Sequence, residues 1–357
     1  MNLTPGETVL GGAFLPHAPQ FFTRPDTEDA ATVARVENVA AKIGERLAAL
    51  RPDVWVTISN DHTQQFFLHC APPFALHVGA EARGSFAGRD FRYEIASEVS
   101  FAVVRQLYAH GFDPAFSSTA EVDYALGIPL SHLRTSGPIL PVFVNAYLPP
   151  QPTMPRCYAF GKAMAAALGV LGVRAVVVAS GGMSHFPGTD RYARPDIDFD
   201  TALLDSIRRG NLQTLAGLDE RQLDESGNIE LRCWAIAAGM LGERVPDILE
   251  FNPSWHHNYC SVAFWQPART AAAPHYPATR PELVALTRAL HGLAYDTSAR
   301  EDYRRDAVSF AQGHGLPADH AKLLCASDFD AMVALGVHPL VSFLARMQLD
   351  REKALKR

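Results

Sequence analysis

The chain has 357 residues, of which 48% are hydrophobic and 20% charged, with a formal net charge of −6 at pH 7. This balance is typical of a globular protein, and it gives no electrostatic basis for binding nucleic acid or an anionic membrane. The five cysteines include no CxxC pair, which argues against a disulfide scaffold and favours reduced thiols and a cytoplasmic location. We expect neither a signal peptide nor a membrane span, since no apolar run approaches about 20 residues.

The first part of the chain alternates predicted strands, loops and helices. Residues 8–15 predict a strand that runs into a proline-flanked loop containing His17. Residues 27–50 carry apolar side chains at helical spacing. Residues 54–59 predict a second strand, which is followed by His62. This order of elements predicts an α/β sheet.

The pattern continues through the middle of the chain. We expect strands at 74–78, 138–145 and 173–178, helices at 96–110, 158–171, 198–218 and 230–241, an aromatic-rich loop at 252–259 and a strand at 261–265. The prolines of the 138–145 segment suggest that it lies near a sheet edge. The fold class is therefore α/β, with a layered arrangement around a central sheet.

The composition changes after residue 266. Residues 267–281 are rich in Pro, Ala and Thr, which is typical of a linker. From 282 to 349 apolar residues recur at helical spacing without a β-like run. We therefore predict a small all-α C-terminal domain of three or four short helices.

The turn Ser180-Gly-Gly-Met-Ser-His185 follows a buried, β-branched segment. Glycines permit a tight turn, and ligands of open α/β sheets bind at the carboxyl ends of strands. His185 can transfer a proton near neutral pH, although an ordinary turn with an exposed histidine explains the stretch equally well. Ser184 is not in a GxSxG register, and there is no P-loop or GxGxxG, so serine-hydrolase, phosphate and dinucleotide sites lack support.

The histidines that follow predicted strands can converge on one cleft. Two neutral imidazoles and a carboxylate form the donor set that holds ferrous iron and leaves positions open for substrate and dioxygen. The candidate carboxylates are Glu225 and Glu230. Glu230 begins a predicted helix, where it can equally serve as a first-turn acid that interacts with the helix dipole.

The adjacent pair His256–His257 lies in the aromatic-rich loop, beside Trp255. Adjacent side chains usually diverge, so we do not expect both to bind one ion. An alternative is that one of the two histidines lines the pocket. A second hypothesis is that the segment from Trp255 to Tyr259 shapes a ring-binding pocket.

Four motifs together resemble the class III extradiol ring-cleavage dioxygenases, the family of the protocatechuate 4,5-dioxygenase beta subunit. They are Leu15-Pro-His17-Ala-Pro, Asn60-Asp-His62-Thr-Gln-Gln-Phe-Phe, Ser180-Gly-Gly-Met-Ser-His185 and Glu230-Leu-Arg-Cys-Trp. Residues 281–349 resemble, less sharply, the small helical alpha subunit of that enzyme. The resemblance implies a catalytic domain at 1–266, a linker at 267–280 and an alpha-subunit-like domain at 281–357.

The family pattern implies that His17, His62 and Glu230 bind Fe(II) and that His185 is the acid–base residue beside the metal. The sequence departs from many catechol-cleaving members, which carry a histidine after a Val-Asp pair where this chain has Tyr124. A tyrosine there is similar to the 2-aminophenol-cleaving branch. A phenol is a poor base near neutral pH, so we expect Tyr124 to orient the substrate by a hydrogen bond.

The resemblance therefore predicts Fe(II)-dependent cleavage of a small aromatic ring with two adjacent donor groups, with both atoms of O2 inserted. An ortho-aminophenol, a dihydroxypyridine or hydroxypyridone, or a catechol would fit. The expected partners are that substrate, O2 and a second copy of the chain in a homodimer, with no nucleic acid or membrane. A zinc-dependent hydrolase and a non-catalytic binding protein on the same fold are the alternatives.

Overall fold

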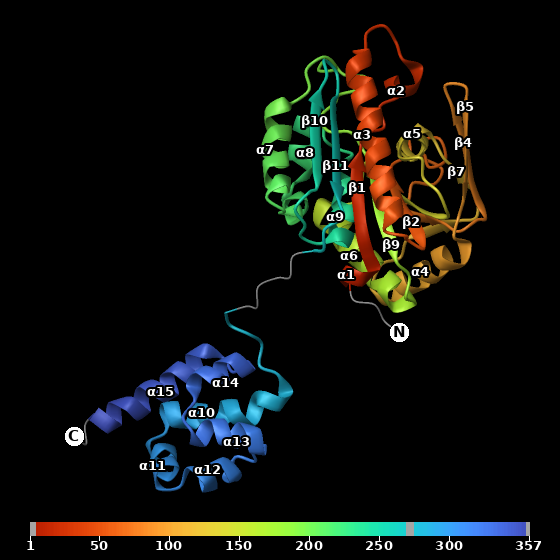
Figure 1. Ribbon diagram of the computed structural model, residues 1–357. Coiled ribbons are helices and arrows are strands. Elements are labelled where there is room, and N and C mark those ends of the chain that lie inside the picture. Colours follow the sequence, from red (N-terminus) through yellow and green to blue (C-terminus); the bar gives the residue numbers. More distant parts are fainter. Residues whose placement is uncertain (1–4, 269–274, 355–357) are drawn as a thin grey trace. The chain divides into compact units, whose positions relative to one another are not determined.

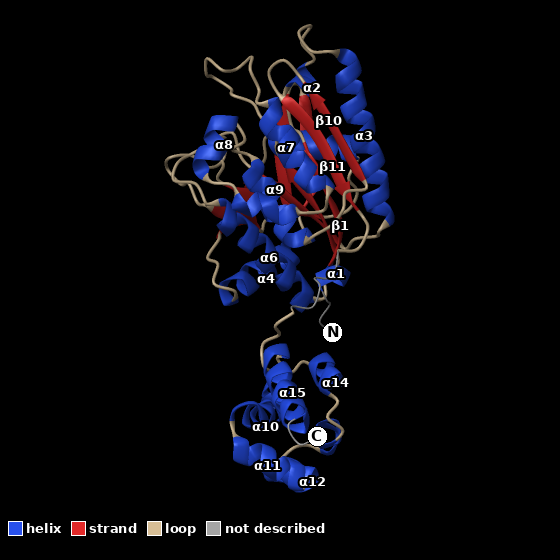
Figure 2. Cartoon of the chain, turned by 90° about the vertical axis from the view of Figure 1, so that its left-hand side faces the viewer, coloured by secondary structure: helices blue, strands red, loops and turns tan. Residues whose placement is uncertain are grey.

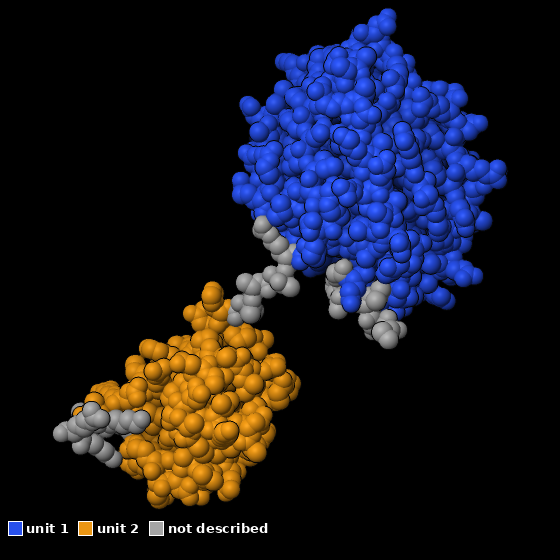
Figure 3. All heavy atoms as spheres, viewed as in Figure 1, with its two compact units in different colours: residues 1–269 blue, residues 270–357 orange. Residues whose placement is uncertain are grey.

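The computed structural model describes residues 5–268 and 275–354. The chain divides into two compact units, Met1–Arg269 and Thr270–Arg357 (Figure 3). The expected linker at 267–280 falls partly outside the described residues. The first unit combines a sheet with helices, and the described part of the second is helical (Figure 2). The predicted fold class, α/β with a helical C-terminal region, is confirmed.

An eight-stranded sheet forms the centre of the first unit (Figure 1). Its strands are β1 (Val9–Leu15), β2 (Val54–Ser59), β3 (Phe74–His77), β6 (Ala115–Ser117), β8 (Ile139–Val144), β9 (Ala175–Ser180), β10 (Ile248–Pro253) and β11 (Asn258–Phe264). The strand order is β10-β11-β1-β9-β2-β8-β3-β6. Strands β1, β9, β2 and β8 are parallel, whereas β11 is antiparallel to β1 and β3 to β8. The four parallel strands therefore end at the same edge of the sheet.

Helices cover both faces of this sheet because its inner strands are apolar on both sides. In β2, Trp55 packs into one hydrophobic cluster, and Val54 and Val56 pack into the other. The Trp55 cluster includes α3 (Ala30–Ala49) and α5 (Tyr124–Leu133). The opposite cluster includes α4 (Ser97–Ala109), α6 (Met154–Leu171) and α9 (Leu231–Leu241). Alternating side chains thus build the layers on either side.

The first unit has further helices and a second, smaller sheet. They are α1 (Pro5–Thr8), α2 (Gln20–Thr23), α7 (Ile197–Arg208), α8 (Glu220–Ser226), the 3-10 helix η1 (Leu212–Gly217), and a second sheet of β4 (Glu81–Phe86), β5 (Arg89–Glu94) and β7 (Ala120–Glu121). Asp123 lies between β7 and α5, and its side chain accepts a hydrogen bond from the backbone N–H of Ala125, which caps α5.

Three sequence-based expectations for this unit are wrong. The helix expected at 198–218 is divided, because α7 ends at Arg208 and Gly210 adopts a φ of +83° before η1 begins. Strand β8 is internal, not at an edge. It tolerates Pro141 because its ladder with β3 stops at Val142. The loop expected at 252–259 is half strand, because only residues 254–257 lie between β10 and β11.

The second unit contains more helices than the three or four expected. Its described elements are the 3-10 helix η2 (Pro281–Leu283) and the helices α10 (Val284–Tyr295), α11 (Thr297–Arg305), α12 (Ala307–Gly313), α13 (Ala318–Cys325), α14 (Phe329–Leu335) and α15 (Pro339–Ala354). They share one apolar core that includes Leu286, Leu290 and Met332. The aspartates Asp296, Asp306 and Asp328 cap the short helices α11, α12 and α14. None of the helices that the structure describes is long and apolar enough to cross a membrane.

Candidate metal centre and active site

Three neighbouring parallel strands lead into the histidines of the site. Strands β1, β2 and β9 end shortly before His17, His62 and His185. Strand β9 lies between β1 and β2 in the sheet. All three histidines therefore follow strands that end at one edge, where α/β sheets bind their ligands.

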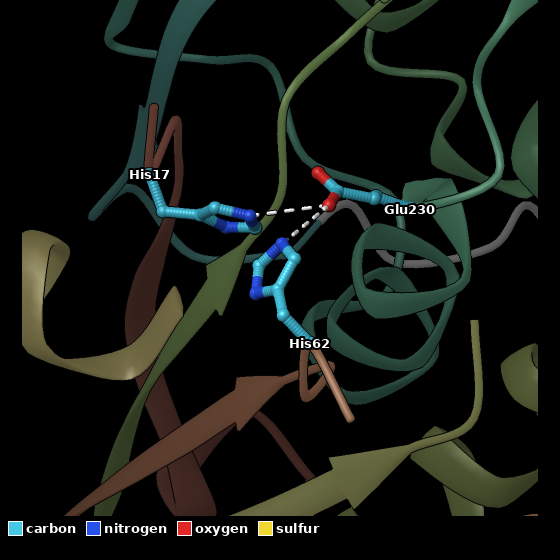
Figure 4. A group of neighbouring side chains, drawn as sticks. All are labelled: His17, His62 and Glu230. Carbon is cyan, nitrogen blue, oxygen red and sulfur yellow. Dashed lines mark ion pairs between the residues drawn. The ribbon is translucent and has the colours of Figure 1, made fainter. Parts of the chain in front are cut away.

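His17, His62 and Glu230 form a group whose potential ligand atoms all lie within 4.8 Å of one another (Figure 4). The Nε2 atom of His17 lies 3.1 Å from Oε1 of Glu230, and Nε2 of His62 lies 3.9 Å from the same oxygen. Two imidazoles and a carboxylate are the donor set of many non-haem iron sites and of some catalytic zinc sites. The structure thus brings together the three residues that the sequence resemblance implies as ligands.

Hydrogen bonds direct the lone pairs of both imidazoles toward Glu230. The Ser180 hydroxyl donates to the carbonyl of Ala125, so its oxygen accepts from Nδ1–H of His17 at 2.9 Å. Nδ1 of His62 lies 2.6 Å from Oδ2 of Asp123. With both Nδ1 atoms bonded in this way, the Nε2 atoms are free to bind a metal, an arrangement common around metal-binding histidines.

Glu230 is completely buried at the beginning of α9. Burial opposes ionisation, but the positive charge of the His17 and His185 imidazoles, when these are protonated, outweighs it and holds the pKa of the Glu230 carboxyl well below its ordinary value. Its Oε2 accepts the backbone N–H of Gly182 at 2.6 Å, and its Oε1 accepts hydrogen bonds from Asn60 and Tyr147. A buried anion that faces several imidazole nitrogens fits a bound divalent cation, which would balance its charge.

The other candidate acid, Glu225, lies outside this group. Its carboxylate pairs with Arg221 one turn earlier in α8, and its side chain is 60% exposed. The sequence alone left both acids as candidates. In the structure, Glu230 lies in the group with His17 and His62, and Glu225 does not.

His185 lies beside the metal group but is not part of it. Its Nδ1 lies 2.8 Å from the carbonyl oxygen of Met183, so Nδ1 carries the proton and Nε2 is the acceptor. Nε2 lies 3.9 Å from Oε1 of Glu230. Burial lowers the pKa of His185, which favours the neutral ring with a free lone pair at Nε2.

The two glycines before His185 leave space for neighbouring side chains. The sequence by itself suggests instead that they permit a tight turn. Neither Gly181 nor Gly182 has a positive φ. A Cβ on Gly181 would lie 3.2 Å from Cβ of Glu230, and one on Gly182 would lie 1.8 Å from Nε2 of His257. The absence of side chains here therefore lets Glu230 and His257 approach the turn.

Tyr124, the first residue of α5, stacks on His62 with ring centroids 4.2 Å apart. Burial and the charge of Asp123 raise the pKa of its hydroxyl, so it stays protonated and can donate a hydrogen bond. Beside it lies a cavity of about 180 Å³. Its lining includes His17, His62, Tyr124, Tyr147, His185, Tyr192, His256 and His257.

Sequence reasoning did not single out Tyr147, and it left His257 only as one of two alternatives for lining the pocket. Tyr147 donates a hydrogen bond to Glu230, and its oxygen lies 3.2 Å from Nε2 of His62. Like the histidines, it follows a strand of the parallel group, β8, and this position was the available signal. His257 stacks on His185 with ring centroids 4.1 Å apart. The only signal for His257 in the sequence was that it forms an adjacent pair with His256.

The rest of the 255–259 segment has other contacts. His256 lines the cavity but is bonded through Nε2 to Glu28, which also accepts from the hydroxyl of Tyr259. Trp255 is 47% exposed, and its ring N–H donates to the carbonyl of Thr27. The turn contributes its two histidines to the cavity wall, whereas Trp255 is not among the lining residues.

Comparisons with known proteins agree on the nature of the first unit. Residues 11–263 match the family described as the catalytic LigB subunit of aromatic ring-opening dioxygenase. A 2,3-dihydroxyphenylpropionate/2,3-dihydroxicinnamic acid 1,2-dioxygenase of Mycolicibacterium gilvum is 32% identical over 231 residues, covering 64% of this chain and 69% of the relative. A protein of the same name from Klebsiella pneumoniae is 30% identical over 235 residues, covering 65% of this chain and 71% of the relative.

A solved structure has a similar fold. The crystal structure of an uncharacterized protein from Escherichia coli K12 matches with a TM-score of 0.50 and 14% identity, covering 71% of this chain and 99% of that one. At this identity the likeness concerns the fold alone.

Proposed function

The chain belongs to the family of the catalytic LigB subunit of aromatic ring-opening dioxygenases, and on this premise we propose that it opens its substrate ring in an Fe(II)-dependent reaction. It is an extradiol ring-cleavage dioxygenase. The metal, the substrate class and the role of each residue are our proposals. The observation that supports them is the buried group of His17, His62 and Glu230 beside a cavity that also contains His185.

We assign the metal to His17, His62 and Glu230. Ferrous iron bound there would supply the redox chemistry with dioxygen and bind the two adjacent donor groups of the substrate. The protein fixes the donors: Ser180 and Asp123 hold the imidazoles, and Gly182 and Tyr147 hold the carboxylate.

His185 is the proposed acid–base residue. Its Nδ1–H is bonded to a backbone carbonyl, which leaves Nε2 to accept a proton from a donor group of the substrate and to return it as the ring opens. Tyr124 is the proposed hydrogen-bond donor to the substrate, because its raised pKa excludes it as a base near neutral pH.

The proposed substrate is a small aromatic ring with two adjacent oxygen or nitrogen donors. The names of the relatives contain vicinal dihydroxy acids, which supports a catechol-type ring. Tyr124, in the place where many catechol-cleaving members have histidine, favours an ortho-aminophenol or a hydroxypyridone. Both classes satisfy the requirement for two donors that bind one metal.

Anaerobic reconstitution of the metal-free protein tests this function. Fe(II) should restore dioxygen uptake with at least one of catechol, 2-aminophenol and a dihydroxypyridine, with one O2 consumed per ring opened. Equal restoration by Zn(II), or hydrolysis without dioxygen uptake, would favour the zinc hydrolase. Stoichiometric iron without turnover of any of these rings would favour a binding protein.

We also propose that residues 281–357 are the counterpart of the small helical alpha subunit and that the protein is a homodimer. The single apolar core shared by α10–α15 supports the first part, because it gives these helices a folded core of their own. Sedimentation equilibrium of the full chain tests the second part, and a monomer at micromolar concentration would contradict it.

A further inference from the structure

His257 occupies an unusual place next to the proposed acid–base residue. It is the last residue of the turn between β10 and β11, and it is 4% exposed. It forms an antiparallel bridge with His185. On either side, Met183 N donates to the carbonyl of Asn258, and Asn258 N donates to that of Ser184. The backbones that carry the two histidines are therefore held together.

The two imidazole rings lie flat against each other. Their planes differ by 1° and their centroids are 4.1 Å apart. The ring of His185 is thus restrained by the hydrogen bond of Nδ1 to Met183 and by the face of His257. The two restraints act on different parts of the ring, since one holds its edge and the other limits its tilt.

The polar atoms of His257 do not account for its burial. Among the residues that the structure describes, Nε2 of His257 is buried and has no hydrogen-bond partner. His257 is also outside the group that could hold a metal. Burying an unpartnered ring nitrogen is costly, so a structural role alone would favour an apolar residue here.

Gly182 makes room for this ring. Its Cβ, if present, would lie 1.8 Å from Nε2 and 2.5 Å from Cε1 of His257. Gly182 has no positive φ, so its backbone does not require glycine, whereas the imidazole of His257 does. The chain thus pairs a glycine on one segment with a histidine on another, 75 positions later in the printed sequence.

We propose that His257 is a positioning residue for the ring-opening reaction: its imidazole, seated in the space left by Gly182, lies against His185 and keeps Nε2 of His185 directed toward the metal centre. This inference rests on the proposed acid–base role of His185. A ring free to tilt would present its lone pair to the substrate for only part of the time, and small misplacements of a catalytic group are costly.

A double-mutant cycle in the full-length, Fe(II)-loaded protein tests the proposal. The variants are His257→Ala, Gly182→Ala and the double variant. His77→Ala is the matched control, since it removes another buried histidine that lies outside the cavity lining. The measurements are iron content, substrate affinity under anaerobic conditions, kcat, and the orientation of the His185 ring in a crystal structure of His257→Ala.

We expect His257→Ala to lower kcat by roughly 10- to 100-fold with iron content and anaerobic affinity close to those of the wild type. Gly182→Ala should have a similar effect, because its methyl group displaces the His257 ring. In the His257→Ala background that methyl group should cost little more, which gives a strongly non-additive cycle. His77→Ala should retain kcat.

Several results would overturn the proposal. Additive effects would mean that Gly182 acts independently of His257. A large loss of substrate affinity with unchanged kcat would make His257 a substrate-binding residue, and an unmoved His185 ring in the His257→Ala crystal would remove the positioning role. A wild-type protein without dioxygen uptake would instead refute the proposed function, and this result is distinct because it precedes any substitution.

Discussion

The site contains two histidine pairs that are built differently. In the ligand pair, as we call the proposed metal ligands His17 and His62, each Nδ1 is bonded to a side-chain oxygen. Their rings meet edge to face with centroids 5.2 Å apart. In the stacked pair, His185 and His257, the rings are parallel, and Nδ1 of His185 is bonded to a backbone carbonyl.

The electrostatic surroundings of the two pairs also differ. Burial disfavours the charged form of His62, but the hydrogen bond and charge of Asp123 outweigh it and raise the pKa. Burial lowers the pKa of both His185 and His257. A carboxylate partner increases the basicity of a metal-binding imidazole, whereas a carbonyl partner leaves a neutral ring available for proton transfer. Partner chemistry, rather than residue type, therefore separates His62 from His185.

The largest expected effect comes from breaking the ligand pair. His62→Ala or Glu230→Gln should lower metal affinity by more than the roughly 10- to 100-fold that loss of an outer hydrogen-bond partner costs, and dioxygen uptake should fall to background. Metal analysis after anaerobic reconstitution checks this. The control is Glu225→Gln, an exposed acid five residues before Glu230. Full iron content in His62→Ala would remove the ligand assignment.

Breaking the stacked pair should leave the metal in place. His185→Ala should lower kcat by about 10²- to 10⁴-fold while iron content stays at the wild-type level, because His185 lies outside the metal group. Steady-state dioxygen uptake and iron analysis on the same samples measure both quantities. Nearly normal turnover with intact iron would show that another group transfers the proton.

The hydrogen bond between Nδ1 of His62 and Asp123 provides a further test of the difference between the two pairs. Asp123→Ala should weaken metal binding by roughly 10- to 100-fold, since Nδ1 of His62 loses its carboxylate partner. Asp123 also caps α5, and loss of a cap costs about 1 kcal/mol of stability. Asp306→Ala is a matched control because it removes the cap of α12 in the second unit. Metal titration should separate the two variants, and equal metal affinity in both would contradict the role of Asp123.

The smallest effect is expected at Tyr124, which stacks on the ligand pair through His62. Tyr124→His should shift the ratio of kcat/KM for catechol over 2-aminophenol upward by about tenfold, the scale of one hydrogen bond of about 1 kcal/mol or slightly more. Tyr124→Phe separates loss of the hydroxyl from change of the ring. An unchanged ratio in Tyr124→His would remove the argument from this residue to the substrate class.

Much of the site could be predicted from local sequence. The apolar runs before His17, His62 and His185 specify strands through their composition alone, and parallel strands place their ends at one edge. The motifs around these histidines and Glu230 carried the resemblance to the family. Similarly, the helical spacing after residue 281 indicated an all-α unit, although the number of helices depended on the aspartate caps that divide it.

Contacts between distant segments were decided by the tertiary structure. Glu230 and Glu225 are both acids near the start of α9, and only the packing of α9 against the sheet buries one beside the histidines. The hydroxyl of Tyr147 and the amide of Asn60 reach Glu230 across separations of 83 and 170 residues. Gly182 leaves space for the ring of His257, a residue that is distant in the sequence and that the fold brings next to it. Sequence patterns indicate which segments are helices or strands and where these end. These contacts between distant segments depend instead on how the layers pack around the sheet edge.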